Sequence, residues 1–207
     1  EKVASFWKVS DEDFFIVPKE FIGPALNKIY ELERPQLKDI PFNPRLPSEF
    51  VFKRSFFDTI KKKDFLVHHP YESFYTVVEF LNFAAEDPNT ILIKQTLYRS
   101  CEKSPIMAAL IRAAQNGKDV TVVIELKARF DENNNIEEAT RLRKAGVKVV
   151  YGFVDLKTHT KLTLVVRKTL EKLDYFVHLS SGNYNTDTAR HYTDLSLFTA
   201  KPGIGRD

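Results

Sequence analysis

Four side chains of the sequence have the chemistry of a phosphate site, and each of them follows an apolar run. Arg99 and Arg129 come after the first two runs, and His159 and Lys161 come after the third. A guanidinium binds phosphate oxygens at two points, an ammonium supplies a point charge, and a neutral imidazole attacks phosphorus well. The set therefore predicts an anion site with a histidine nucleophile. The alternatives are a solvated rim of cations at strand ends and a histidine that is hydrogen-bonded at a sheet edge.

A second group of polar residues follows later in the chain. Asn183 ends the sequence Ser-Ser-Gly-Asn after another apolar run, and Asp194 stands eleven residues beyond Asn183. An amide can donate to a phosphoryl oxygen, and a carboxylate can orient an imidazole N–H. Alone, Ser-Ser-Gly-Asn is an ordinary turn, so this group supports a site only together with His159.

The carboxyl ends of neighbouring parallel strands would bring these positions together, because ligands gather there in an open α/β sheet. Apolar, β-branched runs predict strands, while one-sided apolar spacing bounded by Pro at the start or Gly at the end predicts helices. From Lys161 onward strands predominate, and residues 168–174 are predicted to form a hairpin turn. The predicted fold class is α/β, a mixed β-sheet flanked by helices. The expected strands are 91–97, 120–126, 147–151, 162–167, 175–179 and 195–199, and the expected helices are 70–86, 105–116 and 135–145.

A proline-rich stretch divides the chain into two parts. Residues 31–49 hold four prolines and little hydrophobic periodicity, which is typical of an extended connector. We expect residues 1–47 to be the end of a preceding domain plus this connector, and residues 48–207 to be a catalytic domain. The first residue is Glu1 rather than Met, so we interpret the chain as a piece of a longer protein.

Composition narrows the classes of partner and compartment. The 31 Lys and Arg against 28 Asp and Glu give a net charge of +3, which is not a nucleic-acid footprint. One cysteine fits a reducing, cytoplasmic location, and no apolar run approaches the roughly 18 residues of a membrane span. The sequence contains neither a metal-ligand cluster of recognisable spacing nor a Walker-type glycine loop.

The order of the motifs around His159 resembles that of the phospholipase D superfamily. His159 and Lys161 match the start of the pattern His-x-Lys-x-x-x-x-Asp, but Val166 stands where that pattern has Asp. This departure argues against an ordinary phosphodiesterase.

Five ordered blocks are similar to hallmarks of the first polyphosphate kinase family, and together they cover roughly residues 58–200. The blocks are LVHHPYESF at 66–74, IKQTLYR at 93–99, ELKARFD at 125–131, LKTHTK at 156–161, and GNYN at 182–185 leading to ARHYTD at 189–194. The resemblance implies the end of a head domain followed by a phospholipase D-like catalytic domain.

The same resemblance implies roles for individual residues. His159 would be the autophosphorylated residue, and Tyr192 would lie in the ATP site. In that family, Mg²⁺ is associated with the positions that match Arg99 and Arg129. A guanidinium group has no lone pair with which to ligate a metal. We therefore interpret these arginines as contacts to phosphate beside a magnesium–phosphate complex. The expected partners are ATP, ADP and inorganic polyphosphate. We expect the full-length protein to be a homo-oligomer, and peripheral association with the inner membrane stays open.

The predicted function is reversible transfer of the ATP γ-phosphate to the end of polyphosphate through phosphohistidine, with Lys161, Asn183 and Asp194 assisting. Two rival hypotheses remain. One is a phospholipase D-like phosphodiesterase that needs no ATP, and the other is a non-catalytic module that binds polyanions.

Overall fold

The computed structural model describes residues 6–7, 10, 12, 23–40, 42–47, 56–98, 104–125, 132–152, 156–170 and 172–207. The chain forms two compact units, Glu1–Phe42 and Asn43–Asp207. The first contains the helix α2 (Gly23–Tyr30) and the short 3-10 helix η2 (Pro35–Leu37). The division lies within the proline-rich stretch, and the predicted domain boundary between residues 47 and 48 stays a prediction.

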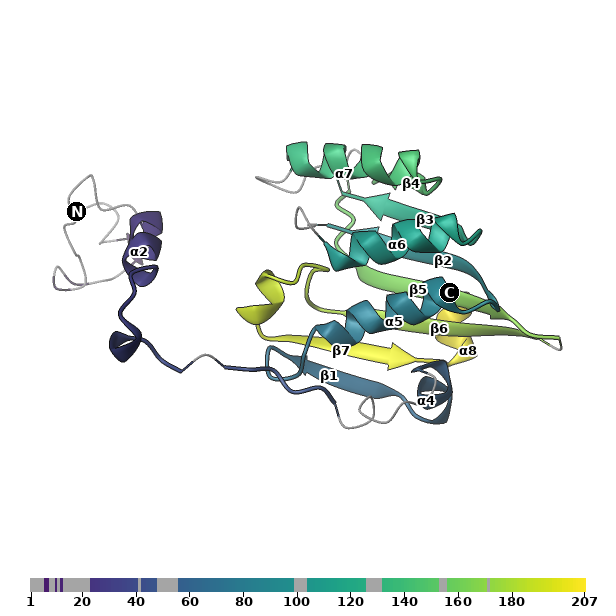
Figure 1. The fold of residues 1–207 in the computed structure, drawn as a ribbon, viewed down its shortest axis with the longest axis horizontal. Coiled ribbons are helices and arrows are strands. Elements are labelled where there is room, and N and C mark those ends of the chain that lie inside the picture. Colours follow the sequence, from purple (N-terminus) through teal and green to yellow (C-terminus); the bar gives the residue numbers. More distant parts are fainter. Residues whose placement is uncertain are drawn as a thin grey trace. The chain divides into compact units, whose positions relative to one another are not determined.

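A seven-stranded mixed sheet is the centre of the second unit, in the order β1-β7-β6-β5-β2-β3-β4 (Figure 1). Strands β2, β3 and β4 run parallel to one another, while all the other neighbouring strands are antiparallel. The predicted mixed sheet is therefore confirmed. The strands are β1 (Phe65–His69), β2 (Thr90–Leu97), β3 (Asp119–Ile124), β4 (Lys148–Tyr151), β5 (Lys161–Lys168), β6 (Leu173–Ser180) and β7 (Asp194–Thr199).

Helices cover the sheet, and α5 and α6 lie side by side across one of its faces (Figure 1). Ser104 caps α6 by accepting a hydrogen bond from the Met107 amide at 3.4 Å, and Pro105 takes the first helical position, as the sequence predicted. Gly117 follows the end of α6 with φ +82°, a backbone conformation that favours glycine. The helices of this unit are α4 (Phe56–Lys62), α5 (Tyr75–Glu86), α6 (Pro105–Gln115), α7 (Glu132–Lys144), α8 (Pro202–Arg206) and the 3-10 turn η3 (Thr188–Arg190).

An aromatic cluster packs α4 and α5 onto the sheet. Phe57 of α4 stacks on Phe176 of β6 with ring centroids 4.4 Å apart, and Phe80 of α5 meets Phe198 of β7 at 5.5 Å. All four rings are buried, so each contributes roughly 1.5–3 kcal/mol of hydrophobic stabilisation. This cluster fixes the helices at the half of the sheet that contains β6 and β7.

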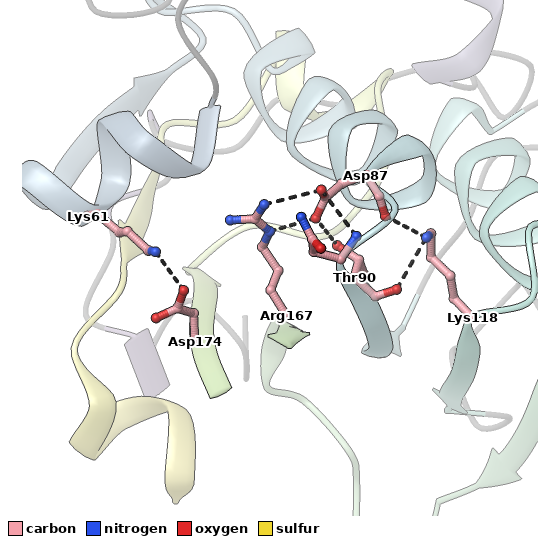
Figure 2. A network of polar contacts seen from close by, with 7 residues as sticks. Lys61, Asp87, Thr90, Lys118, Arg167 and Asp174 are labelled. Carbon is pink, nitrogen blue, oxygen red and sulfur yellow. Dashed lines mark hydrogen bonds and ion pairs between the residues drawn. The ribbon is translucent and has the colours of Figure 1, made fainter. Parts of the chain in front are cut away.

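A polar network ties the start of β2 to the end of β5 (Figure 2). Arg167 forms a two-point ion pair with Asp87, with N···O distances of 2.6 and 3.2 Å, and its guanidinium lies 4.9 Å from the Phe57 ring. Lys118 donates to the backbone oxygens of Asp87 and Thr90 at 2.6 and 3.2 Å. Because these residues lie at the end of β5 remote from Lys161, they belong to the scaffold.

The segment that precedes α5 differs from the sequence prediction. The helix expected over 70–86 begins only at Tyr75, and Pro70 lies in a turn after a cis His69–Pro70 bond. The preceding residues form β1, where Val67 and His69 face inward while His68 faces solvent. Two histidines in a five-residue strand lower its apolar content, which hides the alternation that would predict it.

The remaining elements follow the prediction with shifts of a few residues. The hairpin β5–β6 is confirmed, with Lys168 paired to Leu173 at its closed end. The short helices α4 and α8 were not predicted. Within the described ranges, the helices are all too short or too polar to cross a membrane.

Candidate active site

His159 lies in the irregular segment 156–160, directly before β5. The residue is exposed and lines a pocket of about 380 Å³. Its lining combines polar residues with leucines from β1, β6 and β7. The lining residues are Leu66, His159, Thr160, Lys161, Leu179, Ser180, Ser181, Leu195 and Leu197.

Lys161 and Tyr98 lie beside His159. Lys161 begins β5 and Tyr98 follows β2, and these two strands are neighbours in the sheet. The Tyr98 ring meets the His159 imidazole edge-on, with centroids 5.0 Å apart and an interplanar angle of 80°. The Lys161 ammonium lies 5.2 Å from the centre of the same ring and donates to the His159 carbonyl oxygen at 2.5 Å. The structure thus brings His159 and Lys161 to one pocket, while their catalytic roles stay predictions.

The electrostatic surroundings favour a neutral imidazole. Although the His159 side chain is exposed, partial desolvation of its ring lowers its pKa below the ordinary value, and the positive charges of Lys161 and Lys157 lower it further. Burial also lowers the pKa of Lys161, although the Asp194 charge acts in the opposite direction. A histidine that loses its proton readily keeps a lone pair available for attack at neutral pH.

Asp194 stabilises the turn that follows β6, where Ser180 and Ser181 line the pocket. Its Oδ1 accepts a hydrogen bond from the Ser181 hydroxyl at 2.7 Å, and Ser181 Oγ in turn accepts from the Leu195 amide at 3.0 Å. The predicted contact between Asp194 and the imidazole stays a prediction. Asn183 is half-buried, and its Oδ1 has no hydrogen-bond partner among the described residues.

A chain of hydrogen bonds connects buried His69 to the same turn through two serine hydroxyls. His69 lies 2.9 Å from Ser196 Oγ, Ser196 Oγ lies 3.3 Å from Ser180 Oγ, and Ser180 Oγ accepts from the Gly182 amide at 3.0 Å. His69 is only 2% exposed, so its role within this arrangement is to support the turn.

Other predicted site residues are not among the lining residues of the pocket or lie outside the described part of the chain. Tyr192 follows η3 and is 63% exposed, so its ring is accessible, while its predicted place in an ATP site stays a prediction. Arg99 and Arg129 lie outside the described residues. The last described residues after β2 and β3 are Tyr98 and Glu125, and in the sequence they immediately precede the segments that contain the two arginines.

His178 is buried completely, which separates it from the pocket. Its Nδ1 lies 2.7 Å from the Tyr184 hydroxyl, and that hydroxyl accepts from Thr163 Oγ1 at 2.8 Å. Burial, followed by the charge of His69, lowers the pKa of His178 to about 3. This histidine is a neutral part of the core.

Three residues that contact the His159 segment were not predicted from the sequence to have a role: Tyr98, Thr96 and Glu125. Glu125 is 2% exposed and its Oε2 accepts a hydrogen bond from the Thr158 amide at 2.7 Å. The signal for Glu125 was a lone acidic residue directly after an apolar strand. Among the described residues, no group of three or more His, Cys, Asp or Glu side chains could hold a metal ion.

The second unit has the fold of a mixed-sheet α/β domain, and the same fold occurs in solved structures. NucT from Helicobacter pylori superposes with a TM-score of 0.51 at 18% identity, covering 70% of this chain and 89% of NucT. At this identity the likeness concerns the fold alone. The predicted fold class is confirmed.

Sequence comparison then gives the family. Residues 55–207 match the family model for polyphosphate kinase C-terminal domain 1, and the chain belongs to this family. The polyphosphate kinase of Halalkalibacterium halodurans is 54% identical over 164 residues, or 79% of this chain and 23% of that protein. The polyphosphate kinase of Erythrobacter litoralis is 49% identical over 195 residues, or 93% of this chain and 27% of that protein.

A solved structure agrees with the sequence comparison. The crystal structure of polyphosphate kinase from Porphyromonas gingivalis superposes with a TM-score of 0.78 at 36% identity, and covers 97% of this chain and 34% of that one. This chain therefore spans about a quarter to a third of the length of these relatives.

Proposed function

We propose that this chain is the part of a polyphosphate kinase that accepts the γ-phosphate of ATP on His159 and passes it to the end of a polyphosphate chain. The observation that carries the proposal is the exposed His159 at a pocket, beside an ammonium group and with a lowered pKa. The family membership supports the choice of substrates.

The first step is an in-line displacement. The lone pair of a neutral imidazole nitrogen forms a bond to Pγ, the bond between Pγ and the bridging oxygen breaks, and ADP leaves with the electron pair. In the second step a terminal oxygen of polyphosphate attacks the same phosphorus and the N–P bond breaks, which restores the imidazole. Both steps are reversible, because the enzyme exchanges one phosphoanhydride for another.

The surrounding cations would neutralise the charge of the transferring group. Lys161 is held beside His159, and we assign Arg99 and Arg129 to the phosphate oxygens because guanidinium is matched to them at two points. Asn183 would hold one phosphoryl oxygen through its amide, and Asp194 would orient the imidazole. Tyr192 would pack against the nucleotide.

Magnesium enters this proposal as part of the ATP complex. Guanidinium groups cannot ligate a cation, so Arg99 and Arg129 fit phosphate contact and do not fit metal ligation. When bound, Mg²⁺ supplies charge neutralisation across the phosphate oxygens. A cytoplasmic location, peripheral contact with the inner membrane and a homo-oligomeric full-length enzyme stay predictions.

The two rival functions differ from the proposal in what they do with ATP. We would incubate the full-length enzyme with γ-labelled ATP and measure label on protein and on polyphosphate. The kinase predicts an acid-labile, base-stable protein label that is chased into polyphosphate. A phosphodiesterase would hydrolyse a diester substrate without ATP, and a binding module would retain polyphosphate without any protein label.

A further inference from the structure

The backbone on both sides of His159 is held by side chains from the ends of β2 and β3. On the N-terminal side, the Thr158 amide donates to Glu125 Oε2 at 2.7 Å. On the C-terminal side, Thr96 Oγ1 donates to the Thr160 carbonyl oxygen at 2.6 Å and accepts from the Leu162 amide at 2.9 Å.

Glu125 is placed to anchor and not to react. It is 2% exposed and does not line the pocket that contains His159. A buried carboxylate gains most from a charge-assisted hydrogen bond, and the Thr158 amide would lose this acceptor if the Glu125 side chain were removed. The bond to Thr158 is therefore a strong local constraint on a segment that has no regular secondary structure.

The anchor itself is fixed within the fold. Asn135 donates through its side-chain amide to the Glu125 carbonyl oxygen at 2.9 Å and to the Tyr98 carbonyl oxygen at 3.2 Å. The Glu125 amide donates to the Leu97 carbonyl oxygen at 3.0 Å. The residues that follow β2 and β3 are thus hydrogen-bonded to each other as well as to the His159 segment.

Gly152 leaves the space that this contact needs. A Cβ atom at position 152 would lie 2.7 Å from Thr158 Oγ1 and 3.4 Å from Glu125 Oε2. Any larger residue at the exit of β4 would push against Thr158, so the close approach of this segment depends on glycine.

From these contacts we propose that Glu125 and Thr96 are positioning residues, which hold the imidazole of His159 at the angle and distance that phosphoryl transfer needs. The inference rests on the proposed role of His159 as phosphoryl acceptor. A displacement of about 1 Å at a reacting group can cost on the order of a hundredfold in rate. Loss of the Glu125 or the Thr96 side chain should consequently slow phosphoryl transfer. Nucleotide binding should stay nearly unchanged, because neither side chain lines the pocket.

The test uses the full-length enzyme and measures the rate of histidine phosphorylation at saturating ATP, together with the KM for ATP. Thr96→Val keeps the shape and the strand propensity but removes both hydrogen bonds, whereas Thr96→Ser keeps the hydroxyl. We expect Thr96→Val and Glu125→Ala to lower the rate about tenfold or more with a KM change below about twofold. Thr96→Ser should restore the rate to nearly that of wild type, and Glu125→Gln should restore part of it, since its amide oxygen still accepts a hydrogen bond.

Wild-type phosphorylation rates in both Thr96→Val and Glu125→Ala would overturn the proposal that these residues position His159. A rise in the Mg²⁺ concentration required by Glu125→Gln would do the same, because it would show a metal-ligand role. Glu137→Gln, on the exposed face of α7, is the matched charge control and should behave as wild type. If Glu125→Ala does not fold, the Thr96 pair decides alone. Absence of histidine label on the wild-type enzyme would contradict the proposed function itself, which separates the two failures.

Discussion

The Tyr98 ring packs edge-on against the His159 imidazole, with 5.0 Å between the ring centroids and 80° between the planes. The same ring carries the Lys161 ammonium 5.2 Å from its centroid. One aromatic side chain from the end of β2 therefore contacts both the proposed nucleophile and the cation beside it. This contact joins two motifs that are more than 60 residues apart in the sequence.

Replacing the Tyr98 ring should slow the formation of phosphohistidine. Aromatic pairs and cation–π contacts each contribute about 0.5–1.5 kcal/mol, so Tyr98→Leu should lower the phosphorylation rate by roughly tenfold. Tyr98→Phe keeps the ring and should stay within about threefold of wild type. Rapid-quench labelling of the full-length enzyme measures both rates. Equal losses in the two variants would show that the ring contact is not the cause.

The acid limb of the pH–rate profile should respond to charge near His159. Because partial desolvation and the charges of Lys161 and Lys157 lower the pKa of His159, its imidazole stays neutral to a lower pH than an ordinary histidine does. Lys157→Met removes one of these charges and should raise the pKa, so the rate at pH 6 relative to that at pH 8 should fall. Lys144→Met, exposed on α7, serves as the control. An acid limb that stays fixed or moves to lower pH would contradict this account.

The buried His178 should make the fold sensitive to acid. Its pKa is about 3 in the folded chain, so the unfolded chain takes up the proton first. The stabilisation is complete above about pH 6.5 and is lost as the pH falls toward 3, at up to about 1.4 kcal/mol per pH unit. His178→Asn can keep a partner for the Tyr184 hydroxyl without titrating in this range.

We therefore expect His178→Asn to have a lower Tm than wild type at pH 8 but a smaller drop in Tm between pH 7 and pH 5. His191→Asn, at an exposed position, should follow the wild-type profile. The same acid-induced drop in His178→Asn and wild type would show that His178 is not the group responsible.

Lysine should not replace the two arginines that we assign to phosphate. Arg99→Lys and Arg129→Lys keep the charge but lose the two-point contact, and one charged hydrogen bond is worth about 1.5–3 kcal/mol. A loss of turnover of about tenfold or more is expected in each variant, with no change in the Mg²⁺ dependence. Magnesium titrations of both variants check this, since a large rise in the Mg²⁺ requirement would favour a metal role.

Most of the helices and strands could be predicted from the sequence, but the contacts between them could not. The pattern Ser-Pro before an apolar helix correctly predicted the start of α6, because capping is local chemistry. By contrast, β1 exists because Phe65 and Val67 pair with Phe198 and Ser196 more than 120 residues away, which no local pattern reveals.

The same distinction applies to the site. His159 and Lys161 could be identified together because only one residue separates them in the sequence, and both line the pocket. The anchoring role of Glu125 could not be identified, because it depends on the Thr158 amide 33 residues further along the chain. The hydrogen bond between Ser181 and Asp194 likewise forms only when the end of β6 lies beside the start of β7.

The most direct test of the account is to locate the phosphoryl group on the enzyme. The full-length protein would be labelled briefly with γ-labelled ATP, digested at alkaline pH and mapped by mass spectrometry, with His159→Gln and His191→Gln as paired variants. The account predicts phosphate on the imidazole of His159, complete loss of the label in His159→Gln and an unchanged label in His191→Gln. Phosphate on His178 or His191, or a label that persists in His159→Gln, would contradict it.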